Sequence, residues 1–214
     1  ANGADLATIT VTLRDVNGNP VTGVEVAVAS DGTGNALTQP TGPTDGAGHA
    51  TATLATTVAE LKTVTAKADP LGAPVVLAQQ PTVEFVGDPA TIDPDLSSAL
   101  AAPSAGVVAD GTSTSTVTVG VRDAHGNPVA GQTVAIAADG TGNTLVQPAG
   151  PTDSGGFATA TIASTKAELK TVTVTVNPLG SPVVLTDRPT VGFVGDASKG
   201  SPALSSVVAR PVGG

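Results

Sequence analysis

The fold class can be inferred from Thr116-Val-Thr-Val-Gly-Val-Arg122, which is followed directly by Asp123-Ala-His-Gly-Asn-Pro128. Its valines occupy every second position, so they share one face of an extended chain, and the threonines share the other. Gly126 can adopt a positive φ at no steric cost, which favours a tight turn after the strand. The stretch therefore predicts a half-buried β-strand that ends in a turn.

The whole pattern occurs twice in the 214-residue chain. With an offset of 108 residues, 62 of 106 aligned positions are identical, and no insertion or deletion is needed. Gly18-Asn-Pro-Val21 aligns with Gly126-Asn-Pro-Val129, and Glu60 to Thr65 align with Glu168 to Thr173. A repeat of this length indicates a tandem array of whole domains rather than one fold with internal symmetry.

Each repeat reads as an all-β domain. About seven short segments of alternating or β-branched residues are separated by turn residues, without helical periodicity, and this pattern is typical of a β-sandwich. The sequence contains no cysteine, so no disulfide can form, and it contains no Trp, Tyr or Met. The core must be aliphatic, and Phe85 and Phe193 are expected to join it from the last strand of each repeat.

Charge and composition argue against several classes of protein. The net charge is −9 and the sequence pI is about 4.3. Nucleic-acid binding needs clustered cations and stacking aromatic residues, which the sequence lacks. No apolar run approaches the roughly 18 residues of a membrane span. We therefore expect no nucleic-acid partner and no membrane-spanning segment.

Three motifs resemble the group 1 bacterial immunoglobulin-like domain of invasin- and intimin-type adhesins. They are Asp15-x-x-Gly-Asn-Pro-Val21, Thr44-Asp-x-x-Gly-x-Ala-Thr-Ala-Thr-Leu54 and Lys62-Thr-Val-Thr65, and the likeness covers nearly the whole chain. The resemblance implies two tandem immunoglobulin-like β-sandwich domains that form a non-catalytic stalk of an extracellular adhesin or surface fibre. The implied location is extracellular, on the bacterial cell surface. The alternatives are a module that binds a host receptor or glycan, or a phage or virion decoration protein.

The repeats and the immunoglobulin-like fold are out of phase. Residues 1–88 are predicted to form a sandwich that lacks its own first strand, 89–95 a linker, 96–196 a complete sandwich, and 197–214 the first strand of a following domain. Either the sequence is a piece of a longer array, or the chain assembles head-to-tail, with residues 204–212 filling the vacant edge of another copy. The expected partners are therefore other copies or neighbouring repeats, and a host receptor bound by a separate tip domain. The interaction residues would be Leu204, Ser205, Ser206, Val207, Val208 and Ala209.

Few residues suggest a metal site or a catalytic site. Asp93 and Asp95 in the linker are the only candidate calcium ligands, and no other cofactor is expected. Asp15 to Asn19 superficially resembles a calcium loop, but its glycine is at the fourth rather than the sixth position, so we interpret it as a turn. No catalytic residue is proposed, because the sequence has no spacing typical of a nucleophile and base, and we expect no enzyme activity.

The remaining polar residues have plain structural interpretations. His49 and His125 align with Phe157 and Asn17, so neither is retained between repeats, and His49 is expected on the exposed face of a strand. Glu60 and Lys62, with their counterparts Glu168 and Lys170, are expected to be solvated charges in loops and strands.

Overall fold

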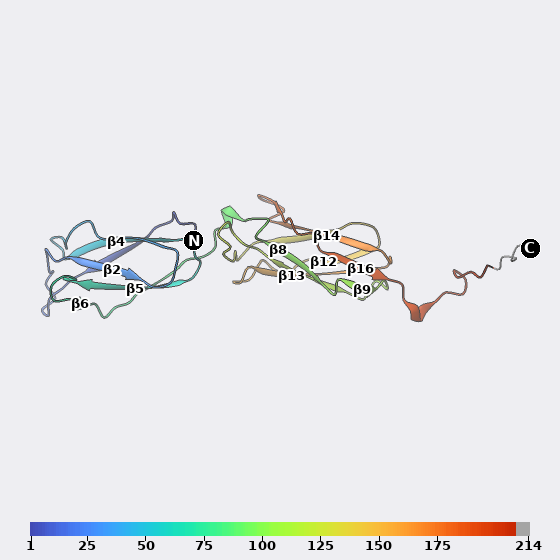
Figure 1. The fold of residues 1–214 in the computed structure, drawn as a ribbon, viewed down its shortest axis with the longest axis horizontal. Helices are drawn as coiled ribbons and strands as arrows, with labels where there is room; N and C mark the ends of the chain where they lie inside the picture. The colour runs from blue at the N-terminus through green and yellow to red at the C-terminus, as the bar shows by residue number, and fades with distance from the viewer. Residues whose placement is uncertain (209–214) are drawn as a thin grey trace, which may run out of the picture. The chain divides into compact units, whose positions relative to one another are not determined.

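A computed structural model describes residues 1–208, and it is built almost entirely from β-strands (Figure 1). The alternating patterns of the sequence form these strands, which confirms the all-β prediction. In the first repeat the strands are β1 (Ala7–Thr12), β2 (Val26–Ser30), β3 (Asn35–Thr38), β4 (His49–Thr56), β5 (Leu61–Ala68), β6 (Val75–Val76) and β7 (Thr82–Glu84). In the second they are β8 (Ser98–Ala102), β9 (Ala105–Val108), β10 (Ser115–Gly120), β11 (Val134–Ala138), β12 (Asn143–Val146), β13 (Phe157–Ser164), β14 (Leu169–Val176), β15 (Val183–Val184) and β16 (Thr190–Val194).

The only helical elements among residues 1–208 are two 3-10 turns, η1 (Pro89–Thr91) and η2 (Ala197–Lys199). Each begins after an aspartate, Asp88 or Asp196, whose carboxylate accepts a hydrogen bond from the backbone two residues later. A single turn of this kind is far shorter than a lipid bilayer is thick, so the described part of the chain holds no membrane-crossing helix.

Two sheets form the first repeat. One has the order β1-β4-β3, and the other has the order β2-β5-β6, with β7 also paired to β5. All these pairings are antiparallel; β1, for example, places Ile9 opposite Ala52 and Val11 opposite Ala50. The second repeat has the corresponding sheets with one more strand in each, in the orders β12-β13-β10-β8 and β11-β14-β16-β9, with β15 paired to β14. The last strand of that second sheet, β9, runs parallel to β16.

Both cores consist of aliphatic side chains on alternate residues. In the first repeat Ile9, Val11 and Leu13 face inward against Leu54 and Val64, and the intervening threonines face out. In the second repeat Val117, Val119 and Val121 are completely buried. Phe193 is buried as predicted, and Phe85 is partly buried against the core of its repeat.

In each repeat a glutamine side chain forms hydrogen bonds with an edge strand of a sheet. The side-chain amide of Gln39 accepts a hydrogen bond from the backbone nitrogen of Val28 at 2.8 Å and donates to the oxygen of Val28 at 2.7 Å. Gln147 makes the same pair of bonds with Ile136. Both polar groups at the middle of β2 and of β11 are therefore satisfied without a neighbouring strand.

The chain divides into two compact units. The first consists of Ala1–Ser97 together with the loops Val121–Gln132 and Asp153–Gly156, and the second contains the remaining residues. The predicted boundaries 1–88, 89–95 and 96–196 follow the strands expected of an immunoglobulin-like domain instead, and they stay a prediction.

Candidate assembly surfaces

Strand β1 leaves one of its edges open in the first repeat. It pairs with β4, and no strand within residues 1–208 pairs with its other side. A groove of about 330 Å³ runs beside this edge. Its lining includes Ile9, Val11, Val64, Ala66, Leu77 and Pro81. An open edge next to a groove that is partly lined by apolar side chains has the geometry that strand addition requires.

The second repeat has a strand in the equivalent position. There β8 pairs antiparallel with β10, with Ala99 opposite Val119 and Ala101 opposite Val117, and both alanines are buried. The added strand changes the burial of the leucine that follows β6 in the first repeat and β15 in the second. Leu185 is completely buried in the second repeat, whereas its counterpart Leu77 is only partly buried. The groove beside β1 is therefore the space that β8 fills in the second repeat.

The predicted interaction residues lie in the tail that follows η2. Leu204 and Ser205 donate backbone hydrogen bonds to the oxygen of Ser201, at 3.2 and 3.0 Å, which closes one turn. Residues 205–208 belong to no strand, and the side chains of Leu204 and Val207 are 90% and 99% exposed. Ala209, the last predicted interaction residue, lies outside the described residues.

The candidate calcium ligands contribute to a turn. The Oδ1 atom of Asp93 accepts hydrogen bonds from the backbone nitrogens of Asp95 and Leu96, at 2.8 and 3.0 Å. Within residues 1–208 the structure places no three acidic or histidine side chains where they could jointly hold a metal ion. Calcium binding by Asp93 and Asp95 stays a prediction.

The loop Asp15 to Asn19 forms a turn and not a calcium loop with ligands at alternate positions. Its carboxylate points inward and accepts hydrogen bonds from the backbone nitrogens of Asn17 and Asn19, both at 2.9 Å. The side chain of Asn19 donates to the same carboxylate at 2.9 Å. These bonds, that from the Asn19 side chain above all, hold the pKa of the Asp15 carboxyl below its ordinary value.

Among residues 1–208 neither histidine belongs to a group of three acidic or histidine side chains that could hold a metal ion. His49 lies on β4, on the face opposite the buried Ala50, and it is half-buried rather than exposed as predicted. His125 is exposed in the turn after β10.

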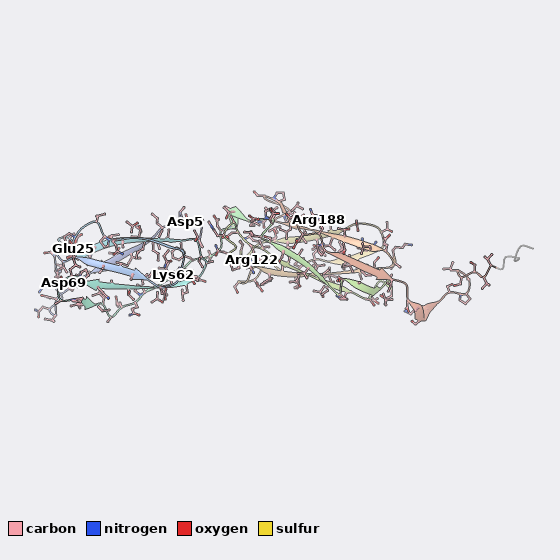
Figure 2. The ribbon with its side chains drawn as sticks, viewed as in Figure 1. Asp5, Glu25, Lys62, Asp69, Arg122 and Arg188 are labelled. Carbon is pink, nitrogen blue, oxygen red and sulfur yellow. The ribbon has the colours of Figure 1, made fainter. Side chains whose placement is uncertain are left out.

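The expectation for Lys62 and Lys170 was wrong, because both side chains are completely buried. Lys62 lies on β5 with the same parity as Val64, so its side chain points into the sandwich (Figure 2). Its ammonium group donates to the backbone oxygen of Thr33 at 2.6 Å and forms an ion pair with Glu60. Lys170 has the corresponding partners, Thr141 and Glu168.

The sequence contained the signal for this lysine. Strand parity alone places it inward, and the Asp-Gly-Thr-Gly-Asn loops that supply the oxygens of Thr33 and Thr141 are identical in the two repeats. The hydrogen bond and ion pair from the ammonium hold the pKa of the Glu60 and Glu168 carboxyls below the ordinary value. The buried lysine thus fastens the loop at the end of each sandwich to the strand beneath it.

Comparison with solved structures supports the two-sandwich architecture. The structure of InvD from Yersinia pseudotuberculosis is similar, with a TM-score of 0.73 and 25% identity, over 94% of this chain and 57% of that chain. The Escherichia coli adhesin FdeC has a TM-score of 0.69 and 24% identity, over 89% of this chain and 59% of that chain, and it supports the fold alone.

Comparison of sequences gives the family. The inverse autotransporter adhesin YeeJ of Escherichia coli strain K12 is 31% identical over 201 residues, which are 92% of this chain and 8% of YeeJ. The chain therefore spans only a small part of the curated relative that it matches. The family described as bacterial Ig-like domain (group 1) matches twice, at residues 1–86 and 97–187. These two matches cover most of the sequence, and the chain belongs to the group 1 bacterial Ig-like domains.

Proposed function

We propose that this chain is a non-catalytic stalk module of a bacterial surface adhesin, located outside the cell, in which repeats join by strand complementation. The relative YeeJ is named as an inverse autotransporter adhesin. A stalk needs repeated domains and a joint that can be reused, and the sequence supplies two similar sandwiches.

The observation that carries the proposal is the groove beside β1, which β8 fills in the second repeat. The tail provides a segment that matches β8 in sequence, because Ser205-Ser206 aligns with Ser97-Ser98 and Val207 aligns with Ala99. Transferring the register of β8 to the tail of another copy places Val207 opposite Val11 and Val208 opposite Thr10. Val207 would then face the groove and Val208 would face solvent.

The join would stabilise both partners. Burial of the Val207 side chain would contribute about 2 kcal/mol, and strand pairing would satisfy the open edge of β1. The contact joins the tail of one copy to the first repeat of the next, so it uses two different surfaces. A contact of that kind extends into a filament unless it closes into a ring.

Static light scattering against concentration tests this joint. The wild-type chain should grow in mass with concentration, and Val207→Asp should weaken association at least about 30-fold, since about 2 kcal/mol of burial is lost. Val208→Asp is the matched control, with the same charge on the solvent side, and should associate like the wild type. A wild-type chain that stays monomeric at millimolar concentration, or equal effects of the two substitutions, would refute the strand joint.

A further inference from the structure

The turn between Asp15 and Asn19, called here the Asp15 loop, has a counterpart between Asp123 and Asn127, called the Asp123 loop. Within each loop the aspartate carboxylate accepts two hydrogen bonds from backbone nitrogens at 2.9 Å. It accepts a third from the asparagine side chain, also at 2.9 Å. The loops therefore hold their aspartate and asparagine in the same geometry, using only their own residues.

Their surroundings are very different. Asp123 is completely buried and Asn127 is 6% exposed, whereas Asp15 and Asn19 are exposed. The Asp123 loop belongs to the first compact unit. There its side chains form hydrogen bonds with the backbone of residues 57–88. The exposed Asp15 loop makes no equivalent contact among residues 1–208.

Four hydrogen bonds make this contact. The longest, 3.4 Å, runs from the Nδ2 atom of Asn127 to the oxygen of Ala1, and the proposal rests on the three shorter ones. The Oδ1 atom of Asn127 accepts from the nitrogen of Ala59 at 2.8 Å, and its Nδ2 atom donates to the oxygen of Thr57 at 2.9 Å. The Oδ2 atom of Asp123 accepts from the nitrogen of Asp88 at 3.0 Å. Burial raises the pKa of the Asp123 carboxyl, but hydrogen bonds from Asn127 and Asp88 outweigh it and keep the pKa below its ordinary value.

The second repeat presents the same three backbone groups without their partners. The oxygen of Thr165 and the nitrogens of Ala167 and Asp196 are the counterparts of the groups bound by the Asp123 loop. In the described part of the chain none of the three atoms takes part in a hydrogen bond. Thr165 and Ala167 are exposed, while Thr57 and Ala59 are half-buried.

We propose that the Asp15 loop is a docking surface for a second copy of this chain and that it binds these three groups. Asn19 would accept from the nitrogen of Ala167 and donate to the oxygen of Thr165, and Asp15 would accept from the nitrogen of Asp196. This inference rests on the proposed head-to-tail assembly and adds to the strand joint a second contact with its own residues.

Gly87 and its counterpart Gly195 give independent support for a match between the Asp15 loop and the second repeat. At Gly87 an added Cβ would lie 2.3 Å from the backbone oxygen of Pro128, so the close approach of the two backbones requires glycine there. Its counterpart Gly195 is also glycine although nothing lies within 4 Å of it in this chain, and the residue that it would approach, Pro20, corresponds to Pro128. The second repeat therefore has the surface shape that the Asp15 loop would need.

Amide NMR with a dilute labelled chain tests the contact. A ¹⁵N-labelled wild-type chain at low concentration is titrated with an excess of unlabelled chain, so that nearly all of its partners are unlabelled. With wild-type partner the amide signals of Ala167 and Asp196 should shift, because both nitrogens become hydrogen-bonded. With Asn19→Ala partner these shifts should be lost, and with Asn17→Ala, which alters a side chain of the same loop outside the contact, they should remain.

The same titration separates this proposal from the strand joint. An Asn19→Ala partner keeps an intact tail, so the amides of Ile9 and Val11 in the labelled chain should still shift. If these β1 amides move with wild-type partner while Ala167 and Asp196 do not, the docking surface is refuted and the strand joint stands. If no signal moves with wild-type partner, both are refuted. The wild-type titration alone decides this, whether or not the Asn19→Ala chain folds normally.

Discussion

Replacing Lys170 measures how much a buried lysine stabilises this fold. Lys170→Ala deletes three methylene groups beyond Cβ, each worth about 0.8 kcal/mol when buried, which gives about 2.4 kcal/mol. It also removes the hydrogen bond from the ammonium to the oxygen of Thr141, which has a length of 2.6 Å. A charged hydrogen bond contributes about 1.5–3 kcal/mol, but the removed ammonium no longer has to be desolvated. We expect a net loss of about 3 kcal/mol.

Lys170→Met separates packing from charge. Methionine keeps an unbranched stem of nearly the same length but cannot donate to Thr141, and the loss of a buried ion pair to an apolar side chain is often close to neutral. We expect Lys170→Met to cost about 1 kcal/mol, so the difference of about 2 kcal/mol between the two variants reports the buried stem. Lys199→Ala is the matched control, because that side chain is 74% exposed, and it should leave stability unchanged.

Thermal unfolding followed by far-UV circular dichroism is the suitable assay, since the chain has no Trp or Tyr to report by fluorescence. A loss of about 3 kcal/mol in a domain of roughly 100 residues lowers the melting temperature by about 12–24 °C. The same pair of substitutions at Lys62 gives a replicate in the other repeat. If the Met and Ala variants melt at the same temperature, the stem is not packed and the reasoning is wrong.

Two further predictions concern pH and backbone geometry. The carboxyls of Asp15, Asp123 and Asp139 have pKa values below the ordinary 3.8, so the unfolded chain binds more protons than the folded one in acid. The stability that they contribute should be fully present above about pH 5 and decline below about pH 4, which melts at pH 7, 4 and 3 would detect; an equal melting temperature at pH 7 and 3 would contradict it. Gly156→Ala should destabilise more than Gly126→Ala in urea unfolding. Both glycines have positive φ, so both variants lose about 1 kcal/mol, but only at Gly156 would the new Cβ lie 2.6 Å from the backbone oxygen of Val121.

The strands could be predicted from the sequence because their evidence is local. Alternation places Val117, Val119 and Val121 in the core, and the Asp-x-x-Gly-Asn motif encodes a turn that the aspartate holds by hydrogen bonds within its own five residues. Residue type predicts that Lys170 is exposed, whereas strand parity places it inward, and its ammonium finds a hydrogen-bond partner there. Its partner, the oxygen of Thr141, lies 29 residues away in the chain. No local sequence pattern indicates that this oxygen lies within reach of the ammonium group.

The candidate surfaces were only partly predictable. The missing strand beside β1 follows from aligning the two repeats, but the groove itself depends on Leu77 and Pro81, which approach from the opposite sheet. The loops at Asp15 and Asp123 share their motif and their internal hydrogen bonds, yet one is exposed and the other buried. Identical residues cannot signal different surroundings, so this difference required the structure.

The glutamine side chains at β2 and β11 have a consequence for the proposed assembly. An unprotected edge strand can pair with an edge strand of a neighbouring molecule, and β-rich proteins aggregate in this way. Gln39 and Gln147 protect the middle of the edge strands β2 and β11, because their side chains form hydrogen bonds with the backbone of Val28 and Ile136. If the proposed strand joint at β1 forms, molecules protected at β2 and β11 would join end to end without pairing there, so neighbouring filaments would stay separate.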